Sequence, residues 1–194
     1  MILDPKNTAL LTLDFQKRIF GFVPGAEAIV PNASKVLACA REQEFQIIHV
    51  GLGFSPGHPE ISDVDTPFKR VKQNDLFVVG TPSAEFHSSI ARPADLVVYK
   101  QRVGAFSENQ LHLILRSRGI KNLVLFGIST SGIVLSTLRR AFDLDFRCVV
   151  IKDACFDGDS EVHRVLTEKV FVTQATVMTA DAFIAALMES KREL

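Results

Sequence analysis

Two ionisable residues directly follow apolar runs and could form an acid–base pair. Asp14 follows the run ALLTL, and Lys100 ends the run DLVVYK. A carboxylate or an ammonium group in such a place is costly to bury unless an opposite charge or hydrogen bonds compensate it. If the two side chains meet in a cleft, each offsets the burial of the other, and the pair can transfer protons. The alternatives are a cap for the next segment at Asp14 and a solvated strand end at Lys100.

A second candidate is the turn GISTSG, which joins an apolar run to a helical pattern. The N–H groups at a helix N-terminus, together with short hydroxyl side chains, could hold an anion or an oxyanion. The residues concerned are Ser129, Thr130, Ser131 and Gly132. The turn lacks the Gly-Lys-Ser/Thr ending of a phosphate-binding loop and the G-x-S-x-G pattern of a serine nucleophile. The alternative is a tight turn that only needs small residues.

Six short runs rich in apolar residues must supply the scaffold for these groups. They lie at 9–14, 45–52, 95–100, 122–128, 146–153 and 176–179. Most are apolar on both faces, which is typical of buried parallel strands. Ligands of such sheets bind outside the carboxyl ends of the strands. We therefore expect Asp14, Lys100 and the GISTSG turn at one edge of the sheet.

Helical patterns alternate with these runs. One begins at the first-turn proline Pro31, a second covers 107–119 with Ser107 and Gln110 as a capping-box pair, a third follows Gly132, and two more begin near Asp159 and Thr179. This alternation predicts right-handed crossovers and a mostly parallel sheet covered on both faces. We expect a single α/β domain over 1–194, a Rossmann-like three-layer α/β/α sandwich. The segment 53–94 is too long for an ordinary connection, so we expect it to cover a site or a subunit contact.

Composition narrows the class of partner. The chain has 194 residues, with 22 Lys+Arg against 22 Asp+Glu, so no net charge attracts nucleic acid or an anionic membrane. No run approaches the ~18 apolar residues of a membrane span, and the N-terminus does not read as a secretory signal. Three cysteines without a disulfide or metal spacing suit a reducing compartment. We expect a cytoplasmic protein with a small-molecule partner.

Three stretches resemble the isochorismatase-like hydrolases, also called the cysteine hydrolases. They are LLTLDFQ, VVYKQRVGAF and NLVLFGISTSGIVLSTLRRAFDLDFRCVVIKDAC, and the resemblance continues to about residue 180. It implies a six-stranded parallel sheet, a homo-oligomer of two or more subunits and catalytic roles for Asp14 and Lys100. It also implies a cis peptide bond between Ile128 and Ser129. Substrate contacts are expected from the turn residues 129–132 and from Gln16, Phe20 and Phe106.

The chain departs from this family at the position of the nucleophilic cysteine, which Ile133 occupies. Isoleucine cannot form a thioester, so the covalent mechanism of the amide hydrolases is lost. Neither Cys148 nor Cys155 can be aligned with that position. The resemblance also includes the isochorismatases proper, which lack the cysteine and hydrolyse a vinyl ether with the aspartate as general acid. It therefore implies that Asp14 is a general acid/base, with Lys100 binding the substrate and tuning the acid.

No metal or other cofactor is expected. The nicotinamidases of the family carry an Asp-x-His and a later His after the second strand, whereas this chain reads HVGLGFSPGH there. His49 lies inside the strand and His58 stands alone, so a ligand set is missing. The end of the second strand, Gly51 to Gly53, lacks the polar residue that binds isochorismate. A small anionic organic substrate is expected, with isochorismate as one candidate.

Three hypotheses follow. The leading one is a hydrolase that uses Asp14 and Lys100 without a cysteine. The alternative is a catalytically silent member that serves as a ligand-binding or oligomeric interaction module. The third is an amide hydrolase with Ser129, Thr130 or Ser131 as nucleophile. It is the weakest, because the sequence shows no general base beside these hydroxyl groups.

Overall fold

The computed structural model describes residues 3–64 and 66–190. Its strands form one sheet in the order β3-β2-β1-β4-β5-β6, and every neighbouring pair is parallel. The strands are β1 Thr8–Leu13, β2 Gln46–Leu52, β3 Leu96–Lys100, β4 Asn122–Gly127, β5 Arg147–Ile151 and β6 Ala175–Met178. The six predicted runs and the predicted parallel sheet are confirmed. The two central strands, β1 and β4, are buried along their whole length, as a sheet covered on both faces requires.

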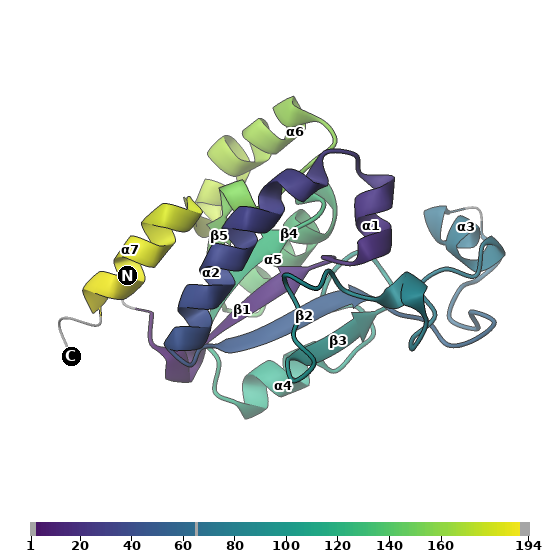
Figure 1. Cartoon of the computed structure of the whole chain (residues 1–194), viewed down its shortest axis with the longest axis horizontal. Coiled ribbons are helices and arrows are strands. Elements are labelled where there is room, and N and C mark those ends of the chain that lie inside the picture. Colours follow the sequence, from purple (N-terminus) through teal and green to yellow (C-terminus); the bar gives the residue numbers. More distant parts are fainter. Residues whose placement is uncertain (1–2, 65, 191–194) are drawn as a thin grey trace.

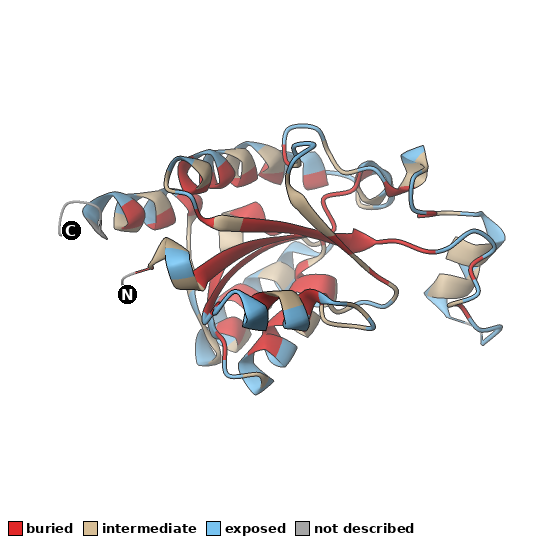
Figure 2. Ribbon diagram, turned by 90° about the horizontal axis from the view of Figure 1, so that it is seen from below, coloured by how far each residue is buried: buried red, intermediate tan, exposed pale blue. Residues whose placement is uncertain are grey.

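Helices cover both faces of this sheet (Figure 1). They are α1 Lys17–Phe22, α2 Val30–Glu42, α3 Pro67–Gln73, α4 Leu111–Ser117, α5 Leu135–Asp143, α6 Ser160–Val165 and α7 Ala180–Ser190. Helices α2 and α7 pack together on one face, while α4 and α5 lie on the other. Figure 2 shows the buried residues concentrated in the sheet and on the helix surfaces that face it. The predicted three-layer α/β/α sandwich is therefore confirmed.

The predicted capping box of the second helical pattern is wrong. Helix α4 begins at Leu111, and Gln110 at its N-cap makes no side-chain capping hydrogen bond. Instead Asn109 Oδ1 accepts a hydrogen bond of 2.9 Å from the N–H of Leu111. Asn is a strong competitor for this role because its short side chain reaches the free N–H groups of a first turn. Ser107 lies in the preceding turn, before the helix starts.

The long segment 53–94 forms structure of its own. It contains α3 and a short 3₁₀ turn, Pro82–Ala84. A small separate hydrophobic cluster ties it to the end of β2 and consists of Leu52, Phe54, Ile61 and Phe77. In Figure 1, α3 lies beyond the carboxyl ends of β2 and β3. Its expected role as a cover or a subunit contact stays a prediction.

Among residues 3–64 and 66–190, no helix is both long enough and apolar enough to span a membrane.

Candidate active site

The centre of the sheet is its topological switch point. The chain leaves β1 towards β2 on one side, whereas β4 lies on the other side and leads to β5. Asp14 follows β1 directly, and its N–H donates to Val50 O at 2.8 Å. The turn after β4 is held against the same place, because the N–H of Ile128 donates to Leu13 O at 3.1 Å. Crevices at such switch points are the usual ligand sites of open parallel sheets.

Asp14 and Lys100 meet at this edge of the sheet. Lys100 Nζ lies 3.0 Å from Asp14 Oδ2 and also donates to Arg102 O at 3.1 Å. Both residues are buried, with exposed fractions of 6% for Asp14 and 1% for Lys100. The other carboxylate oxygen, Asp14 Oδ1, is buried and has no hydrogen-bond partner among the described residues. The predicted pair is thus present, and it leaves one oxygen available.

Burial shifts both groups of the pair towards their neutral forms. It raises the pKa of Asp14, although the charge of Lys100 opposes the shift. It also lowers the pKa of Lys100, although Asp14 opposes that shift. Asp14 further has a left-handed backbone conformation, with φ of 57°, which is uncommon outside glycine and occurs often at functional sites. A carboxyl group with a raised pKa and a free oxygen can serve as a general acid.

The turn after β4 begins with a cis peptide bond between Ile128 and Ser129, as the resemblance implied. Three of its N–H groups already have acceptors within the protein: Thr130 donates to Phe156 O (2.8 Å), Ser131 to Asp157 Oδ2 (2.7 Å) and Gly132 to Ser129 Oγ (3.1 Å). The anion site expected from the turn would therefore have to do without these three donors. Ile128, on the other side of the cis bond, forms an isolated parallel bridge with Phe156, so the chain after β5 runs beside this turn.

The position expected for the nucleophile is filled by an apolar side chain. Ile133 is 2% exposed and belongs to the main hydrophobic core, within a π-helical turn at Thr130–Val134. Cys148 lies in β5 and Cys155 follows that strand, and both are buried. Burial raises the pKa of each thiol to about 12. Neither cysteine is therefore a thiolate at neutral pH.

A histidine that sequence reasoning did not connect with the turn lies beside one of its hydroxyl groups. Thr130 Oγ1 and His163 Nδ1 are 2.8 Å apart. The hypothesis of a serine or threonine nucleophile in this turn is the weakest on the ground that no general base lies beside these hydroxyl groups, and for Thr130 that ground is wrong. However, Thr130 is fully buried, so its hydroxyl group is shielded from any substrate. The pair instead ties the turn to α6, which carries His163.

The other residues expected to bind substrate have different surroundings. The amide group of Gln16 donates to Leu52 O (2.8 Å) and Ala84 O (2.9 Å) and accepts from the N–H of Leu52 (2.7 Å). These contacts do not support its expected role, which stays a prediction. Phe20 is buried in the main core. Phe106 is half-buried and lines a pocket whose other walls include Arg102 and Arg140, and neither Asp14 nor Lys100 lines this pocket.

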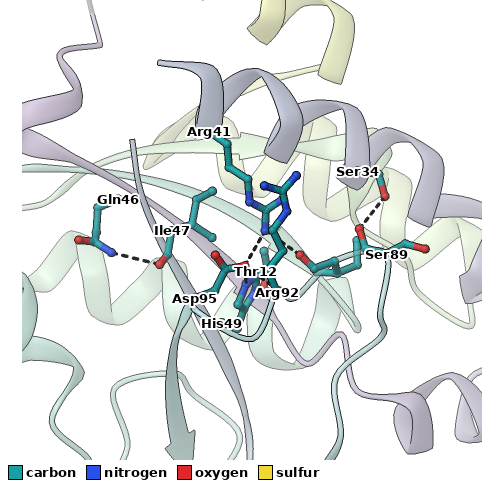
Figure 3. Close-up of polar contacts among 10 residues, drawn as sticks. Thr12, Ser34, Arg41, Gln46, Ile47, His49, Ser89, Arg92 and Asp95 are labelled. Carbon is teal, nitrogen blue, oxygen red and sulfur yellow. Dashed lines mark hydrogen bonds and ion pairs between the residues drawn. The ribbon is translucent and has the colours of Figure 1, made fainter. Parts of the chain in front are cut away.

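A second buried polar network was also missed by sequence reasoning (Figure 3). His49 Nδ1 lies 2.6 Å from Thr12 Oγ1, and His49 Nε2 lies 2.9 Å from Asp95 Oδ2. Arg41 of α2 is the last member of this network and forms an ion pair of 2.6 Å with the same oxygen of Asp95. The network therefore joins β1, β2 and α2 to Asp95, the residue that precedes β3. Burial lowers the pKa of His49, although Asp95 opposes the shift.

Groups able to bind a metal are dispersed. Among residues 3–64 and 66–190, no three His, Cys, Asp or Glu side chains gather in a way that could hold an ion. The expectation that catalysis needs no metal or other cofactor stays a prediction.

Known proteins with similar sequences and folds indicate the family of this chain. The isochorismatase domain family matches residues 8–182. The chain is 32% identical to the uncharacterized isochorismatase family protein YecD of Escherichia coli O157:H7, covering 95% of this chain and 98% of YecD. It is 30% identical to the ureidoacrylate amidohydrolase RutB of Agrobacterium fabrum, covering 93% and 86%. The solved structure of an isochorismatase family protein from Burkholderia thailandensis superposes with a TM-score of 0.80 at 28% identity, covering 96% and 97%. This chain belongs to the isochorismatase family.

Proposed function

We propose that this protein is a hydrolase that uses Asp14 as its general acid/base and Lys100 as its partner, without a cysteine nucleophile. The observation that carries the proposal is the free oxygen Asp14 Oδ1, which is buried at the switch point beside Lys100. An unpaired buried oxygen costs free energy, of order 1–3 kcal/mol. A substrate that hydrogen-bonds to it recovers that cost, which supports a catalytic role over a structural one.

The arrangement suits acid-catalysed addition of water. In a vinyl ether, protonated Asp14 would give its proton to the terminal enol carbon, and the oxocarbenium ion formed would accept water. The carboxylate of Asp14 then takes a proton from that water, and the hemiketal breaks into an alcohol and a ketone. Lys100 would bind the substrate's negative charge and tune the acid. No step needs a thiolate, which agrees with Ile133 at the position of the cysteine.

Amide hydrolysis is the second reaction to consider, because a relative is named ureidoacrylate amidohydrolase. Here water would have to attack directly, activated by Asp14, since no covalent intermediate can form at Ile133. The ammonium group of Lys100 is the donor that could stabilise the oxyanion. The substrate in either case is a small anionic organic molecule, and a homo-oligomeric assembly belongs to the proposal.

A catalytically silent binding module is the alternative function. A protein without catalytic activity would gain little from a buried Asp–Lys pair, because the cost of desolvating the two charges offsets most of their attraction. The retained pair therefore favours an enzyme over a silent module.

One set of assays separates these functions. Pyruvate release from isochorismate and ammonia release from small N-carbamoyl or amide acids should be measured for the wild type and for Asp14→Asn. Loss of the general acid/base should lower kcat by about 10²–10⁴-fold. Asp63→Asn, a change at an exposed loop carboxylate, is the control and should leave kcat unchanged.

Two outcomes would contradict the proposal. Activity of Asp14→Asn within about twofold of the wild type would remove Asp14 from the mechanism. A folded wild-type protein that binds such acids and releases neither pyruvate nor ammonia would favour the silent module.

A further inference from the structure

Arg102, in the loop that follows β3, contacts both the buried ion pair and the long segment 53–94. Its carbonyl oxygen accepts a hydrogen bond of 3.1 Å from Lys100 Nζ. Its guanidinium group donates to Glu60 O at 3.0 Å and lies over the Phe68 ring, 5.5 Å from the ring centre. Glu60 and Phe68 both belong to segment 53–94, and Phe68 lies in α3. One residue therefore connects that segment to the ion pair.

The ammonium group of Lys100 is held by two acceptors of the protein. One is Asp14 Oδ2 at 3.0 Å, and the other is Arg102 O at 3.1 Å. Because Lys100 is only 1% exposed, these acceptors take the place that water has around a surface lysine. A buried charge is tolerated only where such partners compensate it. A shift of the Arg102 carbonyl would therefore move Lys100 relative to Asp14.

The place of that carbonyl depends on side-chain contacts. Residues 101–104 lie outside the helices and strands, so no regular ladder of hydrogen bonds determines their course. The hydrogen bond from Arg102 to Glu60 is charge-assisted, and the contact with Phe68 has the distance of a cation–π interaction. The neighbouring side chain of Gln101 donates to Gly53 O at 3.2 Å. Segment 53–94 therefore holds this loop from outside the sheet.

Arg102 can fill this role without belonging to the core. It is exposed and is a member of neither hydrophobic cluster. Substitution of such a residue usually changes stability little. The effect of Arg102 on the ion pair can therefore be measured in a folded protein.

We propose that Arg102 is a positioning residue for the Asp14–Lys100 pair. By binding Glu60 and Phe68, Arg102 holds its own carbonyl group at the place where Lys100 donates to it. The ammonium group is thereby kept against Asp14. The consequence for turnover rests on the proposed function, whereas the effect on the ion pair does not.

The pKa of Asp14 measures this role without a substrate. Among the described residues, Lys100 is the only charged group that shifts this pKa, and its charge opposes the rise caused by burial. If Arg102→Ala lets the ammonium group move away, the pKa of Asp14 should rise by about 0.5–1. Titration of the Asp14 carboxyl carbon by carbon-13 NMR gives the value, and the spectrum of Asp14→Asn assigns the signal.

Two control variants separate position from charge. Arg102→Lys keeps a cation that can donate to Glu60 O and lie over Phe68, so it should restore most of the pKa of Asp14. Arg140→Ala removes the second arginine that lines the same pocket as Arg102 and should leave that pKa unchanged.

A further variant approaches the same contact from α3. Phe68→Leu removes the ring beneath the guanidinium group and should raise the pKa of Asp14 in the same direction as Arg102→Ala. It replaces Arg102→Ala if that variant does not fold, which thermal unfolding of each protein shows.

Turnover provides a separate readout. As a general acid, Asp14 acts in its protonated form, so kcat/KM should decline above its pKa. In Arg102→Ala this decline should move to higher pH by the same amount as the pKa in the NMR titration. A residue with a merely structural role would lower activity without moving the pH profile.

The outcomes distinguish this proposal from the proposed function. The role of Arg102 is overturned if folded Arg102→Ala leaves the pKa of Asp14 unchanged, if Arg140→Ala raises that pKa equally, or if Arg102→Lys fails to restore it. A pKa that responds as expected in a protein without turnover would overturn the proposed hydrolase alone. Turnover that depends on Asp14, with a pKa that ignores Arg102, would overturn the positioning role and leave the hydrolase standing.

Discussion

Lys100 reaches Asp14 across an intervening strand, since β2 lies between β3, which ends in the lysine, and β1, which precedes the aspartate. Neighbouring strands are about 4.8 Å apart, so the two chains are separated by about 10 Å at this level. The long side chain of lysine covers most of that distance, and the contact of 3.0 Å completes it. The ion pair therefore links the ends of two strands, β3 and β1, that are not neighbours in the sheet.

Removing the lysine should expose the cost of the buried carboxylate. Lys100→Met leaves Asp14 without its counter-charge, which should cost about 3–5 kcal/mol of unfolding free energy near pH 8. The folded-state pKa of Asp14 is already raised, and this change should raise it further. A raised carboxyl pKa gives stability that is present at low pH and lost as pH rises, so the deficit should shrink at about pH 5.

Urea unfolding at both pH values measures this deficit. The double variant Asp14→Asn with Lys100→Met removes both charges and should be more stable than Lys100→Met alone. An equal deficit at both pH values would contradict the assignment of the cost to Asp14.

Alkylation tests the absence of thiol chemistry. Iodoacetamide should leave activity intact, because the pKa of Cys148 and that of Cys155 are raised to about 12 and the thiolate is the reactive form. Activity before and after treatment is the measurement, and unfolded protein provides the positive control for labelling. A variant with both cysteines changed to Ala distinguishes lost catalysis from damage at a structural thiol. If that variant folds and binds substrate yet turns nothing over, a displaced cysteine is the nucleophile.

The contact between β1 and the end of β4 requires a glycine. A Cβ atom at Gly127 would lie 2.1 Å from Leu13 O, which is backbone and cannot rotate away. Gly127→Ala should therefore destabilise the protein by about 1–3 kcal/mol or more and reduce activity. Gly158→Ala is the matched control, since nothing lies within 4 Å of its Cβ position. Thermal unfolding of both variants decides the matter, and equal midpoints would contradict the close approach.

The free energy of unfolding should fall in acid because His49 becomes protonated on unfolding. Because burial lowers its folded-state pKa, the unfolded chain binds the proton more readily, so stability is lost as pH falls below about 6.5. Urea midpoints at about pH 7.5 and pH 5.5 should differ less in His49→Gln than in the wild type. His112→Gln, at an exposed histidine of α4, should behave as the wild type does. If His49→Gln fails to fold, Asp95→Asn provides the second test, since it leaves His49 without its carboxylate. If the urea midpoint of His49→Gln changed with pH as much as that of the wild type, His49 would not be the cause of the loss of stability in acid.

The strands and the Asp14–Lys100 pair could be predicted from the sequence because the signals are local. Each strand is an apolar run, and parallel pairing brings the ends of such runs to one edge. Contacts that depend on the exact rotation of a helix could not be predicted. Thr130 and His163 are 33 residues apart, and His49 and Asp95 are 46 apart. Nothing in either stretch indicates its partner.

The capping error has a different origin. Ser107 with Gln110 fits the spacing of a capping box, but Asn109 lies closer to the first free N–H groups and takes the role. Two residues of a capping type, Ser107 and Asn109, therefore stand close together, and the helix begins beside the second of them, at Leu111. The sequence also predicts free N–H groups in the turn after β4, and this prediction fails because their acceptors lie outside the turn. Asp157 and Phe156, which follow β5, accept hydrogen bonds from two of these N–H groups.

The strand order has a consequence for how the chain acquires its fold. β1 pairs with β4 at the level of Thr8 and Asn122, and a hydrogen bond joins these two side chains across 114 residues of sequence. Contacts between such distant residues slow folding, because a long loop must close before they form. During synthesis β1 therefore keeps one unpaired edge until β4 has left the ribosome, and only then can Asp14 and the turn after β4 come together.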